Sequence, residues 1–345
     1  THVFPVDAAG AQSGEPFVIT DNTASNATTF SAYLQDEWKL TPTLTLNYGA
    51  RYDRFAAYRT EDQLSPRVNL VWQPDSTLTI HAGYARYFVP PPFELVGAAS
   101  IGKFAGTSAA PIVTEDTTPY SERQHYFDIG FQAKPSSSLT YGVDAYYRIS
   151  KNLIDEGQFG APIILTPFNY AQGRIGGVEA NMAYSRGGWN AYANFAVARA
   201  KGRGIVSSQF AFDPDELAYI ANHYIFLDHD QTFTGSAGVT YSIKHGALAR
   251  TAIGASMMYG SGLRTSLALA DGSIVPNGAH LTPYAQFNLT ASHHLAGPNI
   301  DVRLDVINLF DHVYEIRDGR GVGVGAPQYG PRRGIFIGVT KTFGA

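Results

Sequence analysis

Apolar and polar residues alternate with a period of two in many segments of the chain. In residues 44–53, Leu44, Leu46, Tyr48, Ala50 and Tyr52 alternate with Thr45, Asn47, Gly49, Arg51 and Asp53. The same alternation occurs in residues 139–149 and 300–306. Because successive side chains of a β-strand point to opposite faces, this spacing collects the apolar side chains on one face. A helix would need apolar spacings of three and four, which these segments lack. We therefore predict strands.

The template of alternation fits about 13 segments, each roughly 10–13 residues long. They begin near Thr29, Leu44, Ser65, Leu78, Arg123, Leu139, Arg174, Trp189, Gln231, Leu248, Tyr284, Asn299 and Arg333. Strands of soluble proteins are most often about 5–6 residues long. Tilted strands that cross a membrane need about 9–11 residues. The lengths therefore favour strands that span a membrane.

The connections between these segments are of two kinds. Short connections rich in Gly, Pro, Asp, Asn and Ser occupy residues 41–43, 74–76, 134–138, 186–188, 244–246 and 296–298. Long connections occupy residues 89–122, 150–173, 201–230, 260–283 and 311–331, and they alternate with the short ones from the third strand onward. Outer-membrane barrels show this alternation, with short periplasmic turns and long extracellular loops. We therefore predict an all-β protein, a transmembrane antiparallel β-barrel over residues 28–345, with residues 1–27 as an extracellular loop or segment that leads into it.

The direction of the strands limits how the barrel can close. The first and last predicted strands both run toward the short turns, and an odd number of strands cannot close as a purely antiparallel ring. Either a strand in residues 161–169 completes the number, or strands precede the chain. An unpaired edge in lipid would cost several kcal/mol for each backbone group. We favour the second explanation and expect the chain to be the C-terminal part of a larger barrel.

Composition agrees with this prediction and excludes other kinds of protein. Charged residues make up 16% of the chain, against roughly 25% in soluble domains. The 21 Tyr and 20 Phe suit the aromatic girdles of membrane barrels. The absence of cysteine excludes disulfides and thiolate metal sites. With a net charge of −4, we expect no nucleic-acid partner.

Short motifs in a fixed order run along nearly the whole chain. They are residues 31–40 (SAYLQDEWKL), residues 44–53, Ser65-Pro66-Arg67, residues 83–90 with Phe93-Glu94-Leu95, residues 176–179 (GGVE), residues 306–311 (VINLFD) with Tyr314, and Thr342-Phe343 near the end. In this order the motifs resemble those of TonB-dependent receptors of the outer membrane of Gram-negative bacteria.

The resemblance implies a barrel of about 22 strands, plugged by an N-terminal globular domain that this chain does not include. Such a receptor takes up a scarce bulky ligand, such as a siderophore or cobalamin, with energy from TonB. The implied partners are outer-membrane lipid and lipopolysaccharide, the TonB complex through the plug, and the small-molecule nutrient itself. A passive, porin-like diffusion channel is the alternative.

Two sets of residues are candidates for function. Binding residues concentrate on loops held by a rigid scaffold, so we expect ligand contacts from Phe93, Phe212, Tyr219, Tyr224 and Tyr329. The polar strand faces place Arg51, Asp53, His81, Asp144, Arg148, Arg303 and Asp305 toward the barrel interior, because a charge on the lipid face costs about 2–4 kcal/mol at mid-membrane. They either pair with one another in a hydrated lumen or contact a plug or a passing ligand.

The long connection over residues 201–230 contains further polar groups. His223 and His229 lie near Asp228 and Asp230 in the sequence, but no helical spacing holds two imidazoles on one face, so we predict no metal site. Acidic residues 213–216 precede an apolar segment and predict a short capped helix. No nucleophile elbow or acid–base pair is found. We therefore expect neither a cofactor nor an enzymatic activity.

Overall fold

The computed structural model describes residues 2–20, 24, 26–92, 101–110, 118–159, 164–207, 212–320 and 326–343. Its main feature is one antiparallel sheet of 14 strands. In spatial order, the main path of the sheet contains β20 (Gly334–Lys341), β17 (Ile300–Ile307), β16 (Tyr284–Leu295), β13 (Thr251–Gly260), β12 (Phe233–Ile243), β10 (Trp189–Ser207), β9 (Ile164–Arg186), β8 (Leu139–Phe159), β7 (Glu122–Ser136), β6 (Leu78–Val89), β5 (Thr60–Asp75), β4 (Leu44–Ala56) and β3 (Thr28–Thr41). The fourteenth, β11 (Ile225–Phe226), pairs with β10 off this path.

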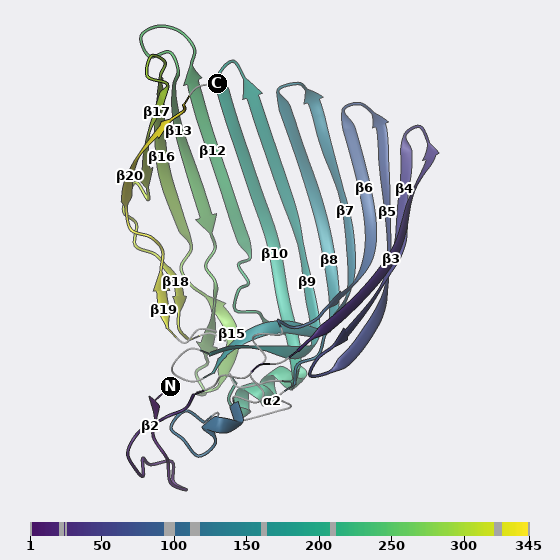
Figure 1. Cartoon of the computed structure of the whole chain (residues 1–345), viewed down its shortest axis with the longest axis vertical. Helices are drawn as coiled ribbons and strands as arrows, with labels where there is room; N and C mark the ends of the chain where they lie inside the picture. Colours follow the sequence, from purple (N-terminus) through teal and green to yellow (C-terminus); the bar gives the residue numbers. More distant parts are fainter. Residues whose placement is uncertain are drawn as a thin grey trace.

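The strands of the main path are the ones predicted from the alternation, and neighbours in the sequence are neighbours in the sheet. The sheet curls around a hollow that is open toward the viewer in Figure 1. Strands β3 and β20 are its two edges, and no pairing joins them among the described residues. The fold is therefore all-β, with the strand order and antiparallel pairing of a barrel wall.

The convex face of the sheet is apolar because the registers of neighbouring strands keep apolar positions aligned. One row across five strands consists of Tyr48, Val68, Tyr84, Phe127 and Tyr147, each the direct partner of the next. Four of the five, Tyr48, Val68, Phe127 and Tyr147, expose more than a third of their surface. A soluble monomer rarely exposes so continuous an apolar surface. Lipid chains, in contrast, would cover it at no cost.

The two ends of the sheet differ as predicted. One end, the turn end, carries the short connections; the other, the loop end, carries nearly all of the longer ones (Figure 1). The exception at the loop end is the connection between β4 and β5, where only residues 57–59 separate the strands. Several of the long connections are themselves ordered into secondary structure, which the alternation did not predict.

The largest difference concerns residues 150–173, which we expected to form a loop. Strands β8 and β9 instead continue through most of this stretch as a paired hairpin, from Ser150↔Gly173 to Phe159↔Ile164. Of the segment considered as an additional strand, residues 161–169, the described part from Ile164 onward is the start of β9 and not a separate strand. The hairpin persists because Leu153, Phe168 and Tyr170 form a buried cluster with Ile220 of the neighbouring connection. Tertiary packing thus extends strands beyond the apolar band.

The other long connections fold against this hairpin and against one another. Helix α2 (Pro214–Asn222) was predicted as a capped helix, and the Asp213 backbone N–H donates to the Glu216 carboxylate at 3.1 Å. Two small hairpins, β14–β15 and β18–β19, were not predicted. Their strands are β14 (Arg264–Ala268), β15 (Ile274–His280), β18 (Glu315–Asp318) and β19 (Pro327–Tyr329). Among the described residues, no helix has the length and apolar character of a membrane span.

Residues 2–20 also lie at the loop end. They form a small hairpin of β1 (His2–Val3) and β2 (Phe17–Val18). Val3 and Ile19 are buried there with Ile101 and with Phe104 of the 3₁₀-helix η2 (Gly102–Phe104). Backbone hydrogen bonds join residues 4 and 6 to residues 108 and 106. The first residues are therefore packed against the connection between β6 and β7.

Asn308, in the motif at residues 306–311, ends β17 and fixes the chain that follows. Its backbone has a φ of 51°, a left-handed conformation that Asn tolerates better than most residues. Its buried side chain donates to the carbonyls of His312 and Pro331 and accepts from the His312 N–H, at 2.8–2.9 Å. This one side chain therefore joins both ends of the connection between β17 and β20.

We expect Asn308→Ala to lower the free energy of unfolding by about 2–4 kcal/mol, because buried backbone groups lose their partners and Ala is strained at positive φ. Urea-induced unfolding in lipid vesicles measures this change. Asn299→Ala is the matched control, since Asn299 also has positive φ but is only half-buried and makes a single side-chain hydrogen bond, to the Thr342 carbonyl. Equal losses for the two variants would contradict the role given to Asn308.

Candidate functional site

Most of the charged residues predicted to face the barrel interior are paired with one another or with close neighbours. Arg51 Nε donates to Asp53 at 2.7 Å, and Arg303 Nε donates to Asp305 at 2.8 Å. Each pair joins residues two positions apart, which lie on the same face of a strand. Asp53 also accepts from the Ser31 hydroxyl, which the sequence did not single out. Arg148 is the exception, because its buried Nε lacks a partner within the described part of the chain.

His81 and Asp144 form a cluster that spans three strands. His81 Nε2 lies 3.2 Å from Asp144 and 3.5 Å from Asp128, an acid that sequence analysis missed. His81, Gly130 and Asp144 are direct partners across β6, β7 and β8. A Cβ on Gly130 would overlap the Asp144 carboxylate and come within 2.8 Å of the His81 ring. The glycine therefore provides the space in which the imidazole reaches the carboxylate.

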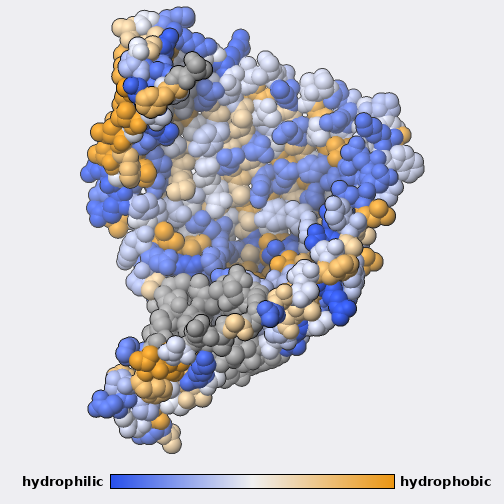
Figure 2. Space-filling model, in the orientation of Figure 1, coloured by the Kyte–Doolittle hydropathy of each residue, from blue (hydrophilic) through white to orange (hydrophobic). Residues whose placement is uncertain are grey.

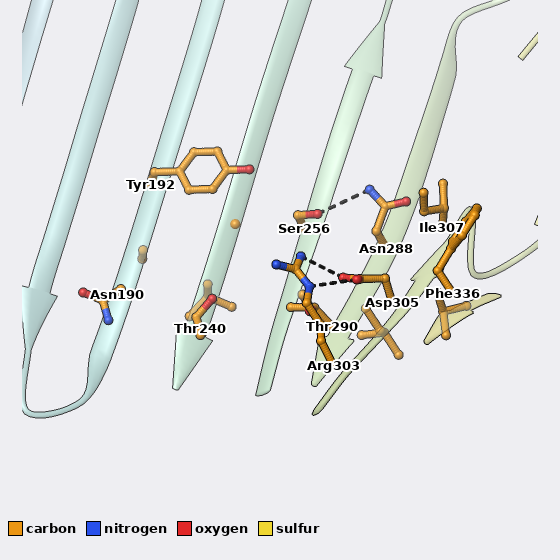
Figure 3. A pocket seen from close by; sticks show the side chains of 16 residues that line it. Asn190, Tyr192, Thr240, Ser256, Asn288, Thr290, Arg303, Asp305, Ile307 and Phe336 are labelled. Atoms are coloured by element: carbon orange, nitrogen blue, oxygen red, sulfur yellow. Dashed lines mark hydrogen bonds and ion pairs between the residues drawn. The ribbon is translucent and has the colours of Figure 1, made fainter. Parts of the chain in front are cut away.

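The polar face of the sheet lines the hollow. Figure 2 shows mostly hydrophilic surface inside it, with hydrophobic side chains gathered at one edge. A pocket of about 570 Å³ lies on this face over strands β10 to β20. Figure 3 shows Arg303 and Asp305 beside Asn288 and Ser256 in this pocket, the last two joined by a hydrogen bond of 3.3 Å. The surface offers charged and amide groups to water or to a polar molecule in the hollow.

A buried ion pair holds the loop end to the sheet. Arg264 of β14 donates to Asp230 Oδ1 through Nε and Nη2 at 2.8 and 2.7 Å, and both side chains are less than a tenth exposed. Asp230 Oδ2 accepts the backbone N–H of Ala200 in β10. The Arg264 guanidinium also stacks on the Phe226 ring at 3.4 Å. The pair therefore fixes the β14–β15 hairpin relative to the strands.

A second pocket, of about 660 Å³, lies between the β14–β15 and β18–β19 hairpins. Exposed side chains line it, among them Tyr329, Arg320, His280 and His312. Arg320 donates to Asp318 at 2.8 Å, and Asp318 accepts the Thr265 hydroxyl at 2.7 Å, so the two hairpins are joined beside the pocket. We call this the loop-end pocket. It combines aromatic surface with a cationic group.

The aromatic residues expected to bind a ligand lie in different environments. Tyr329 lines the loop-end pocket and is 60% exposed. Tyr219 stacks on His223 at 4.3 Å. The Tyr224 ring contacts two guanidinium groups, that of Arg174 at 4.7 Å and that of Arg203 at 5.1 Å from its centroid. These three keep some exposed surface, so they can contact a ligand.

One of the expected residues, Phe212, offers no such surface in the structure. Phe212 is 3% exposed and packs edge-on against Phe168 and Tyr170, so its role here is packing. Phe93 lies outside the described residues. Sequence alone could not distinguish a packed loop aromatic from an exposed one, because the packing partners come from strands that were predicted as loop.

The pKa values of two carboxyl groups at the loop end are shifted in opposite directions. Hydrogen bonds from the Arg332 side chain and the Arg333 backbone hold the pKa of Asp311 well below its usual range. Burial, and next the charge of Asp228, raise the pKa of Asp155 to about 7. Asp155 lies beyond the apolar band, because the exposed apolar side chains of β8 end at Ile149. Asp311 therefore stays ionised in its ion pair with Arg332. Asp155, in contrast, is an enclosed carboxyl group that binds a proton more readily than usual.

Long antiparallel strands, an apolar convex face, a polar hollow and a folded loop end define the wall of a membrane β-barrel. The chain belongs to the family described as TonB dependent receptor-like, beta-barrel, whose sequence model matches residues 4–309. The resemblance drawn from the ordered motifs is therefore confirmed. Members of this family and the similar structures are receptors and transporters, which also confirms the expectation that the chain is not an enzyme.

Several known proteins resemble the chain over different extents. The ferripyoverdine receptor of Pseudomonas aeruginosa has a TM-score of 0.66 at 14% identity, over 96% of this chain and 41% of that one. The FrpB iron transporter of Neisseria meningitidis has a TM-score of 0.62 at 16% identity, over 91% and 45%. The copper transporter OprC has a TM-score of 0.63 at 16% identity, over 92% and 47%.

One relative matches in sequence. The TonB-dependent transporter Oar of Myxococcus xanthus is 30% identical over 107 residues, which are 27% of this chain and 10% of that protein. The chain thus spans less than half the length of each of these relatives. At such identities the solved structures show a shared fold.

We expect Arg264→Met to lower the free energy of unfolding by about 3–5 kcal/mol, because it leaves the buried Asp230 carboxylate without its cation. Arg320→Met is the control: its ion pair is exposed, and its loss should cost under about 1 kcal/mol. Denaturant titration of both variants in lipid tests the difference. Similar, small losses would show that the Asp230–Arg264 pair does not hold the loop end in place.

Proposed function

We propose that the chain forms the C-terminal wall of an outer-membrane receptor that takes up a scarce, bulky iron chelate of the siderophore type, with energy from TonB. In this arrangement the turn end faces the periplasm and the loop end faces the exterior. Family membership supports the receptor class. The FrpB iron transporter and the ferripyoverdine receptor among the similar structures favour this cargo.

The loop-end pocket is the observation that carries the proposal on the ligand. Its volume of about 660 Å³ lies within the range of roughly 300–1,000 Å³ typical of small-molecule sites. The Tyr329 ring provides a flat apolar surface, and Arg320 provides a cation for an anionic chelate. Both side chains are exposed, yet the hairpins that carry them are held by the Thr265–Asp318 and Asp230–Arg264 contacts. Exposed recognition groups on a fixed support are what a receptor needs at its outer surface.

The polar hollow would serve the next step. On this face, the charges of Arg51 and Arg303 are paired with those of Asp53 and Asp305. A ligand released from the loop end would therefore meet a hydrated wall that binds it weakly. The expected plug, the TonB complex, and lipid and lipopolysaccharide around the convex face are the partners that this proposal includes.

The test is uptake of iron-55 from ferripyoverdine by iron-starved cells that carry the intact gene. We expect Arg320→Ala and Tyr329→Ala each to lower uptake about tenfold, the effect of losing about 1.4 kcal/mol of binding. Arg186→Ala, an exposed arginine at the turn end, is the control and should not change uptake. Uptake should also stop when the proton-motive force is collapsed.

Three outcomes would contradict the proposal. Uptake that persists without the proton-motive force would favour the porin-like alternative. Uptake of copper but not of iron would give the receptor a different cargo. Normal uptake by both loop-end variants would remove the loop-end pocket from the path of the ligand.

A further inference from the structure

Three side chains of metal-binding type meet at the loop end, away from the loop-end pocket. Asp155 belongs to the extended part of β8, while Asp228 and His229 lie between β11 and β12. One ligand atom from each lies within 4.8 Å of the others. The side chain of Asp228 is only 2% exposed. The strand pairing therefore brings together donors that are far apart in the sequence.

Two oxygen atoms on this side of the hairpin lack the hydrogen-bond partners that enclosed polar atoms normally have. Asp155 Oδ2 and the Tyr170 hydroxyl are inaccessible to solvent and accept or donate no hydrogen bond within the described residues. Tyr170 is 0% exposed, and after burial the charges of Asp155 and Asp228 are what most raise its pKa. Tyr170 pairs with Leu153, so its side chain points to the same face of the β8–β9 hairpin as that of Asp155. An enclosed polar group without a partner is unfavourable, and a bound ion would give these oxygen atoms a partner.

We propose that Asp155, Asp228 and His229 bind a divalent transition-metal ion, with the Tyr170 hydroxyl beside it. Carboxylates with an imidazole form a mixed oxygen–nitrogen donor set, which suits ions such as Zn²⁺ or Mn²⁺. Calcium prefers six to eight oxygen ligands, more than these side chains supply. The fourth position of a tetrahedral ion is left for water or for the tyrosine oxygen.

The neighbouring arginine is compatible with this site. Arg317 Nη1 donates to Asp228 Oδ2 at 2.6 Å, so Oδ1 of the same carboxylate remains on the side of His229. Arg317 reduces the local negative charge but does not cancel it, because Asp155 and Asp228 carry two formal charges against its one. His229 Nδ1 lies 2.5 Å from Asp228 Oδ1, too close for both atoms to bind one ion. The imidazole is 63% exposed, and Arg317 Nη2 hydrogen-bonds its Nε2. Binding of an ion would therefore replace the contact between Nδ1 and Asp228 while Arg317 still holds the other ring nitrogen.

The position of the site indicates what a bound ion would do. It would join the β8–β9 hairpin to the segment that leads into β12, and through Arg317 to the β18–β19 hairpin. These are separate connections in the sequence. The ion would thus act as a cross-link of the loop end, independent of the ligand that the receptor takes up. This departs from the expectation of no metal site, which considered only the residues near His229 in the sequence.

Titration calorimetry with Zn²⁺ on the purified full-length receptor in detergent tests the proposal. We expect one ion per chain and a higher thermal unfolding temperature when it is bound, because a ligand of the native state stabilises it. Asp155→Asn should weaken binding at least about tenfold. Tyr170→Phe, which keeps the packing of the ring, should weaken it by a smaller factor. Asp271→Asn is the control, since Asp271 is an exposed loop acid that hydrogen-bonds to Ser273.

Circular dichroism of each variant shows whether its strands have formed before binding is compared. Absence of Zn²⁺ and Mn²⁺ binding by the folded wild-type receptor would overturn the proposal. Unchanged binding by folded Asp155→Asn would overturn it as well, as would a preference for Ca²⁺ over both ions. Since uptake of iron-55 is measured separately, failure here leaves the proposed transport function standing.

Discussion

The constraint on which the structure depends is that a strand in lipid has no water to satisfy its backbone N–H and C=O groups. Each strand must therefore find partners on both sides along the whole thickness of the membrane. The pairing from β3 to β20 achieves this for every strand between the two edges. It also fixes the register, so that rows such as Tyr48, Val68 and Tyr84 face the same side. An apolar outer face and a polar hollow follow from that register.

The same constraint explains why sequence analysis succeeded for the sheet. A strand that faces lipid on one side and water on the other must alternate along its length, so β4, β8 and β17 are visible in the sequence as period-two patterns. The cap of α2 was predictable for a similar local reason, because Asp213 and Glu216 act within one turn. The motif at residues 306–311 indicates the family, but the sequence does not show what the motif does in the fold. The structure shows that its Asn308 is buried and has a left-handed backbone conformation.

The loop end could not be predicted, because non-local contacts determine it. Beyond Ile149 the strands β8 and β9 no longer face lipid, and their pairing is held by the cluster around Tyr170 and Phe168. Phe212 and Tyr329 are both loop aromatics in the sequence, yet one is buried and the other exposed. Asp155 lies near Asp228 only because the β8–β9 hairpin extends beyond the apolar band. The structure therefore has two parts, a wall of paired strands and a folded outer surface. The proposed recognition and cross-linking groups lie on the outer surface.

The most direct test of this account is whether the two faces of a central strand meet lipid and water in alternation. Because these 345 residues contain no cysteine, single cysteines introduced into β7 can each carry one spin label in a bilayer, with any cysteine elsewhere in the full-length protein replaced by serine. The account predicts high accessibility to dissolved oxygen at Phe127, Ile129 and Phe131 on the convex face. It predicts high accessibility to a water-soluble nickel complex at Tyr126 and Gln132 on the concave face. Equal accessibility to the nickel complex at all five positions would contradict a membrane-spanning wall.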